Sequence, residues 1–174
     1  MYSFLQNKEA RTYHKLFKII IDHIDPPISI NCDFEKAIHK AAKKAFGNNL
    51  NIYGCFFHLC QNWLKHVKKL GLTKLYTTNK DFLTIFKLFQ SLAYCKIEDV
   101  INGFDNILNS DIYYRLQENS SFLLVNSFTE YLRIDYISKN ASFHISSWNI
   151  HDRILNKLPA TNNPVESWHA VTTV

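Results

Sequence analysis

The order of strands and helices is decided by residues 28–69, which read ISINCDFEKAIHKAAKKAFGNNLNIYGCFFHLCQNWLKHVKK. Residues 28–32 alternate apolar and polar side chains, and residues 51–56 form a short apolar run bounded by turn residues, so each segment predicts a strand. Apolar residues recur at helical spacing over residues 34–46 and again over residues 57–69. Strands that alternate with helices in this way are typical of a parallel α/β arrangement.

The segments on either side of this stretch differ from each other. Residues 2–5 are interpreted as the end of a further strand, and residues 8–24 as an amphipathic helix. Residues 80–140 carry only helical periodicity, which predicts an all-helical segment. The apolar stripes of that segment are Phe82, Ile85, Phe86, Phe89 and Leu92; Val100, Ile101, Phe104, Ile107 and Leu108; and Phe122, Val125 and Leu132.

A last helix is expected to begin near the C-terminus. Residues 163–166 read Asn-Pro-Val-Glu, with Asn as N-cap, Pro in the first helical position and Glu in the capping position. We therefore expect an α/β core over residues 1–79, a helical insertion over residues 80–158, and a final helix over residues 159–174 that returns to the core.

The composition excludes several classes of protein. The chain has 174 residues, of which 47% are hydrophobic, and this is enough for one well-packed domain. Its four glycines are too scattered to form a dinucleotide-binding motif or a P-loop. Four cysteines in a chain of this size do not indicate a disulfide scaffold. Neither an export signal nor a membrane-spanning apolar run is visible, so we expect a protein of a reducing compartment with no membrane partner.

The positive charge is concentrated in one part of the chain. The net charge is +5, yet the stretch from Lys36 to Lys80 contains nine lysines and no Asp or Glu. Such a stretch favours a polyanionic partner, most often nucleic acid, over an ordinary solvated helix face, which usually mixes both signs. We expect His39 and His66, which lie among these lysines, to be surface residues. The lysines at helical spacing are Lys36, Lys40, Lys43 and Lys44, followed by Lys65, Lys68 and Lys69.

Three features could carry chemistry. Asp33 follows a predicted strand, where α/β folds place ligands, but it could also cap the next helix. Cys55 and His58 could both bind zinc, although a buried cysteine and a hydrogen-bonded histidine explain the pair more simply. Glu166 could be a carboxylate ligand or only a capping residue.

Four blocks of the sequence resemble the transposase domain of Mutator-like elements. Residues 33–37 (DFEKA) resemble the block that contains the second catalytic Asp of that family. Residues 54–62 (GCFFHLCQN) resemble its Cys-x-Phe-His block, and residues 69–72 (KLGL) with Tyr76 continue the pattern. Residues 161–169 (TNNPVESWH) resemble the block that supplies the last acid. The blocks occur in the family's order along nearly the whole chain.

This resemblance implies a fold and an activity. The fold would be α/β, with a ribonuclease-H-like mixed sheet that is truncated at its N-terminal end and a helical insertion before the final helix. Asp33 and Glu166 would be the second and third catalytic carboxylates, holding Mg²⁺ or Mn²⁺ for DNA strand cleavage and transfer. Cys55 and His58 match a family motif whose role stays open. The lysines would contact double-stranded DNA, in the nucleus, and the protein could form a homo-oligomer.

The family's first carboxylate has no counterpart in this sequence, because it would precede the strand expected at residues 2–5. We therefore expect a fragment of a transposase catalytic domain that does not cut DNA alone. Two alternatives stay open at this point. One is a non-catalytic DNA-binding protein derived from such a transposase, and the other is a helical protein-interaction module.

Overall fold

The computed structural model describes residues 5–161 and divides them into two compact units. The first contains residues 5–55 and residue 161, and the second runs from Phe56 to Ala160. Of the described residues, 65% are helical and 5% are in strands. The chain is therefore dominated by helices, and each unit has its own core.

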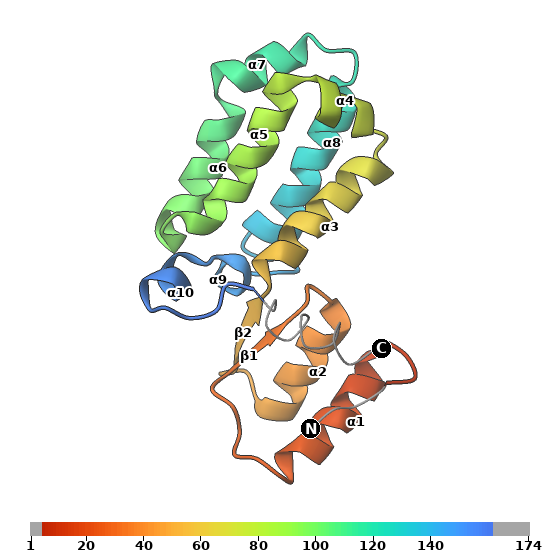
Figure 1. Cartoon of the computed structure of the whole chain (residues 1–174), viewed down its shortest axis with the longest axis vertical. Helices are drawn as coiled ribbons and strands as arrows, with labels where there is room; N and C mark the ends of the chain where they lie inside the picture. The colour runs from red at the N-terminus through yellow and green to blue at the C-terminus, as the bar shows by residue number, and fades with distance from the viewer. Residues whose placement is uncertain (1–4, 162–174) are drawn as a thin grey trace, which may run out of the picture. The chain divides into compact units, whose positions relative to one another are not determined.

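The first unit is a two-stranded parallel sheet with two helices (Figure 1). Its elements are α1 (Ala10–Ile21), β1 (Ser29–Cys32), α2 (Lys36–Phe46) and β2 (Asn51–Gly54). The register pairs Ser29 with Asn51 and Cys32 with Gly54, so both strands end at the same edge. The two helices pack side by side, and their apolar faces form the core of the unit with residues of the strands. That core consists of Tyr13, Phe17, Cys32, Ala41, Ala42, Leu50 and Ile52.

A close contact between Phe34 and Gly54 fixes the carboxyl edge of the sheet. The ring of Phe34 is buried directly over Gly54, and an ideal Cβ on that glycine would lie 2.0 Å from the ring's Cζ. A separation under 3 Å cannot be tolerated without movement of the ring. Position 54 therefore requires glycine, because the ring of Phe34 occupies the space that a side chain would need.

The second unit is a helical bundle (Figure 1). Its elements are α3 (Phe56–Lys69), α4 (Thr73–Thr78), α5 (Lys80–Ser91), η1 (Leu92–Tyr94), η2 (Ile97–Asp99), α6 (Val100–Leu108), α7 (Asp111–Gln117), α8 (Phe122–Leu132), the π-helical turn η3 (Arg133–Ile137), α9 (Ile145–Trp148) and α10 (His151–Leu155). The side chains of Asn79 and Ser110 accept hydrogen bonds from backbone N–H groups at the starts of α5 and α7, so both helices begin with a side-chain cap.

Aromatic rings fill the core of this bundle. Phe128 of α8 is 1% exposed, and its ring centroid lies 6.3 Å from that of Phe82, 5.8 Å from that of Phe86 and 6.4 Å from that of Phe89. These three rings all belong to α5, so Phe128 joins α8 to α5 along about two helical turns. The same stripe of α5 was expected from its spacing in the sequence, and that expectation is confirmed.

The local elements expected from the sequence are confirmed, but the fold class is wrong. The helices α1, α2 and α3 correspond to those expected at residues 8–24, 34–46 and 57–69, and the middle of the chain is helical as expected. The strands β1 and β2 lie within the segments expected at residues 28–32 and 51–56, although Phe56 already belongs to α3. The expected ribonuclease-H-like mixed sheet is absent from residues 5–161, which contain only a two-stranded parallel sheet in a mostly helical structure. The reason is physical: beyond residue 56 the apolar residues recur only at helical spacing, so nothing there can extend the sheet.

Two further expectations concern the ends and the division of the chain. The strand at residues 2–5 and the helix starting at residue 163 fall largely or wholly outside the described residues. The first boundary expected from the sequence lies between residues 79 and 80, whereas the two units divide between Cys55 and Phe56. The helix α3 therefore belongs to the bundle, because its apolar face contributes to the aromatic core there.

We expect Phe128→Ala to lower the free energy of unfolding of the bundle by about 3–5 kcal/mol, because it removes a fully buried ring and leaves a cavity. Trp63 and Trp148 lie in this unit and are buried, so tryptophan fluorescence in a urea titration follows its unfolding. The control is Leu123→Ala on the same helix, at a side chain that is 80% exposed, which should change stability by at most about 0.5 kcal/mol. Equal effects of the two substitutions would contradict the described core.

We expect Gly54→Ala to destabilise the first unit by about 1–3 kcal/mol, because the new methyl group overlaps the ring of Phe34. The measurement is hydrogen exchange at the amides of β1 and β2, which reports the local free energy of opening. In a Phe34→Ala background the same substitution should cost less than about 0.5 kcal/mol, since the clashing ring is gone. An unchanged cost in that background would show that the ring is not the cause.

Candidate nucleic-acid interface

The helix α2 presents four lysines on the side away from the core. Ala41 and Ala42 are buried against α1 because small side chains let the two helices approach closely. Positions three, four and eight residues apart share a helix face, so burying that face turns the lysines of α2 outward together. All four are exposed: Lys36, Lys40, Lys43 and Lys44.

The helix α3 repeats this arrangement in the bundle. Leu59, Trp63 and Val67 are at most 1% exposed and fix one face of α3 against the core. The opposite face carries three exposed lysines, Lys65, Lys68 and Lys69. The structure thus bears out the expectation that the lysines of each helix are exposed together, and each unit carries one lysine face.

Five of these seven lysines form no ion pair with a described residue. Lys43 and Lys44 of α2 and the three lysines of α3 form no ion pair with any residue in the range 5–161. Other basic residues do find partners there: Arg115 donates two hydrogen bonds of 2.8 Å to Asp81, and Arg133 contacts Asp105 and Glu130. Uncompensated surface lysines attract polyanions over about 8–10 Å at physiological salt.

The two histidines among the lysines are not the surface residues expected from the sequence. The His39 ring is half-buried and its Nε2 lies 3.1 Å from the backbone oxygen of Asp33. Burial lowers the pKa of His39, and Lys43 adds to this effect, while the hydrogen bond to Asp33 opposes it. The local environment therefore favours neutral His39.

His66 lies in an aromatic stack instead of on the lysine face. Its ring stacks on that of Tyr131, with centroids 3.7 Å apart and planes 4° from parallel. Burial lowers the pKa of His66, Lys69 lowers it further, and Asp135 raises it. The ring therefore joins α3 to α8 as a packing element, and the positive charge of the α3 face comes from lysines.

Asp33 directly follows β1 at the carboxyl edge of the sheet and is exposed. It is not the cap of the next helix, because α2 begins at Lys36 and its N-cap position is Glu35. The carboxylate of Glu35 is itself engaged: it accepts a 3.2 Å hydrogen bond from Tyr13 and lies 3.9 Å from Nζ of Lys8. Asp33 thus occupies the position where parallel sheets place ligand-binding groups.

The expected metal ligands are not brought together by the part of the chain that the structure describes. Residues 5–161 contain no group of three His, Cys, Asp or Glu side chains that could hold a metal ion. Glu166, the expected partner of Asp33, lies outside these residues. The described residues therefore do not by themselves fit a divalent-metal centre, and no catalytic step is derived through one.

Cys55 and His58 were candidate zinc ligands of open role. Cys55 is fully buried at the end of the first unit, and His58 is half-buried in the first turn of α3, where its ring lies 5.7 Å from that of Phe57. Within the described residues neither belongs to a metal-binding group. The burial of Cys55 agrees with the alternative of a buried cysteine, whereas the hydrogen bond expected for His58 stays a prediction.

One residue of the α3 face was missed in the sequence analysis. Phe57 is 47% exposed, although phenylalanine is usually buried, and it lies four residues before Gln61 and eight before Lys65. Helical numbering from the expected helix at residues 57–69 places these three side chains on the same side. A helical wheel of residues 57–69 therefore places Phe57 on the same side as the lysines of α3.

Comparisons with models of known protein families, with curated proteins and with solved structures find no match to this chain. None of the helices between residues 5 and 161 has the length and apolar character that crossing a membrane requires.

We expect Cys32 to react about a thousandfold more slowly with iodoacetamide at pH 8 than an unperturbed thiol. Burial, with smaller contributions from the charges of Asp33 and Glu35, raises the pKa of Cys32 to about 12, and only the thiolate reacts. Because the pKa of Cys32 is higher in the folded state than in the unfolded state, its neutral thiol contributes fully to the free energy of unfolding below about pH 9. This contribution is lost as the pH rises toward 12. Mass spectrometry of the alkylated peptides measures the rate, with the partly exposed Cys95 as the internal comparison. Equal labelling of both cysteines would contradict the buried position.

Proposed function

We propose that this chain binds double-stranded DNA through the lysine faces of α2 and α3, as a non-catalytic part of a protein related to Mutator-like transposases. The observation that carries this proposal is the acid-free stretch from Lys36 to Lys80, in which the helical lysines are exposed on one face of each helix. Duplex DNA carries one negative charge per about 1.7 Å of axis, so rows of lysines gain affinity by releasing bound counterions.

The spacing of the lysines supports contacts to successive phosphates. On α3, Lys65 and Lys69 are one helical turn apart, which corresponds to about 6 Å along the axis at 1.5 Å per residue. Neighbouring phosphates of one DNA strand are separated by a similar distance, so two lysines can contact adjacent phosphates without distorting the helix. Such contacts position a protein on DNA but do not read its sequence.

The resemblance of the four sequence blocks to Mutator-like transposases supports DNA as the polyanion. The lysines of α3 lie between the second and third blocks of that resemblance, which implies that the lysines contact double-stranded DNA. The mostly helical structure supports a binding role over strand cleavage, because the described residues do not assemble a metal centre. DNA binding by the lysines does not depend on that centre.

We expect DNA binding to weaken steeply with salt. If about five lysines neutralise phosphates, the logarithm of the association constant should fall with the logarithm of salt concentration with a slope near −4.5. Replacing Lys65, Lys68 and Lys69 together by Gln should reduce the size of that slope by about 2.7, since each contact contributes about 0.9. Fluorescence anisotropy with a labelled duplex measures both values.

A matched control uses three exposed lysines of the same bundle outside the acid-free stretch, Lys87, Lys96 and Lys139. Their replacement by Gln changes the net charge equally but should leave the slope unchanged. If both triple variants reduced the slope alike, only the net charge would matter and the α3 face would not be the interface. A flat salt response of the original chain would refute DNA binding altogether.

We expect no nicking of supercoiled DNA by this chain in Mg²⁺ or Mn²⁺, because residues 5–161 bring no three His, Cys, Asp or Glu side chains together to hold a metal ion. Agarose-gel conversion of supercoiled to relaxed plasmid provides the measurement. The variants Asp33→Ala and Glu166→Ala should bind DNA as well as the original chain does. Metal-dependent nicking that disappears in both variants would instead show that the chain is a transposase nuclease.

A further inference from the structure

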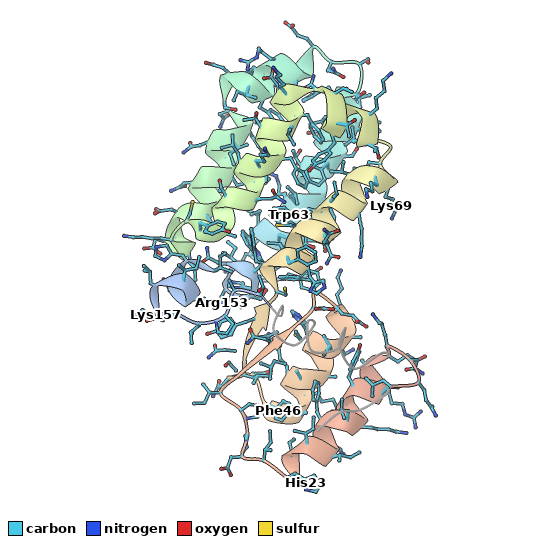
Figure 2. The ribbon with its side chains drawn as sticks, viewed as in Figure 1. His23, Phe46, Trp63, Lys69, Arg153 and Lys157 are labelled. Carbon is cyan, nitrogen blue, oxygen red and sulfur yellow. The ribbon has the colours of Figure 1, made fainter. Side chains whose placement is uncertain are left out.

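The outward face of α3 carries more than lysines. Phe57, Gln61, Lys65 and Lys68 follow one another at intervals of four, four and three residues, which places them along one side of the helix. None of these positions is acidic. The packed side of the same helix carries Trp63, which Figure 2 labels together with Lys69 near the C-terminal end of α3.

The chemistry of this face changes along the helix. Its N-terminal half carries an aromatic ring that is 47% exposed and the partly exposed side chain of Gln61, whereas its C-terminal half carries three exposed lysines. From Phe57 to Lys69 the helix rises about 18 Å at 1.5 Å per residue. One end of the face can therefore contact bases while the other contacts phosphates of the same groove.

We infer that α3 is a base-reading helix that enters the major groove of duplex DNA and prefers A·T base pairs. This inference rests on the proposed DNA-binding function and adds a specificity to it. Gln61 pairs with the N6 and N7 positions of adenine, and the ring of Phe57 packs on the 5-methyl group of thymine. Lys65, Lys68 and Lys69 hold the flanking phosphates.

Groove geometry selects duplex DNA over other nucleic acids. The major groove of B-form DNA is about 12 Å wide and admits an α-helix, and there adenine offers both a donor and an acceptor to a glutamine amide. The minor groove shows the same acceptors for A·T and T·A, and the deep, narrow major groove of A-form RNA excludes a helix. A face with an amide and an exposed ring followed by lysines thus fits the DNA major groove best.

The test compares duplexes that differ only in the major groove. The full chain is titrated by fluorescence anisotropy with an alternating A·T duplex, a G·C duplex of equal length, and A·T duplexes in which 7-deazaadenine replaces adenine or deoxyuridine replaces thymine. We expect about tenfold tighter binding to the A·T duplex than to the G·C duplex. Loss of N7 should remove most of that preference, and loss of the methyl group should weaken binding about threefold.

Two variants assign these effects to residues. Gln61→Ala should bind A·T and 7-deazaadenine duplexes equally, and Phe57→Ala should bind thymine and deoxyuridine duplexes equally. Both variants should keep the salt dependence of the original chain, because the lysines are unchanged, and far-UV circular dichroism verifies that they fold.

The outcomes separate this inference from the proposed function. Salt-dependent binding with equal affinity for all four duplexes, or with equal affinity for a duplex RNA, would overturn base reading by α3 and leave DNA binding intact. A preference for A·T that is insensitive to 7-deazaadenine and deoxyuridine would indicate the minor groove and would also overturn it. Absence of binding to every duplex would refute the proposed function itself.

Discussion

The burial of one face of α3 is the constraint on which the functional argument depends. Leu59, Trp63 and Val67 lie one turn apart and are at most 1% exposed, so the helix cannot rotate without exposing a tryptophan and two aliphatic side chains. Burying such side chains contributes about 1.5–3 kcal/mol each, far more than surface lysines lose by mutual repulsion. The hydrophobic core therefore dictates which residues of α3 face the solvent, and it turns Lys65 and Lys68 outward.

The lysine face of α3 destabilises the free protein slightly but can strengthen the binding of a polyanion. Lysines one turn apart on a helix repel each other by a few tenths of a kcal/mol, and those of α3 form no ion pair with a described acid. The aromatic stack of His66 on Tyr131 and the ring cluster around Phe128 hold the helix in place despite this repulsion. A polyanion bound to the face would remove the repulsion, so the same charges that weaken the free protein strengthen the complex.

Local periodicity was sufficient to predict most elements but not the fold class. The spacing of Phe82, Phe86 and Phe89 predicted both the helix α5 and its buried side, because one face of an amphipathic helix can be recognised within a few turns. The mixed sheet was inferred from a family resemblance of short blocks, and the described residues contain only β1 and β2. The spacing beyond residue 56 is only helical and predicts no strand there, so the wrong fold class came from the resemblance of the short blocks and not from the spacing.

Helical spacing also predicted part of the candidate nucleic-acid interface. The exposure of the lysines followed from helical spacing, whereas the burial of His39 and His66 depended on neighbours from other segments, Phe34 and Tyr131. Phe57 was overlooked because an aromatic residue at the start of a helix is normally assigned to the core. Tertiary contacts, and not the composition of the segment, decided each of these three positions.

The most direct test of DNA binding by the lysine faces is an NMR titration of the ¹⁵N-labelled full chain with a short DNA duplex. The account predicts that the largest shift changes occur at the exposed residues of α2 and α3, while the amides of α6 and α7 stay unchanged. Shift changes that cluster on α6 or α7 with α2 and α3 unaffected, or no changes at any DNA concentration, would contradict it.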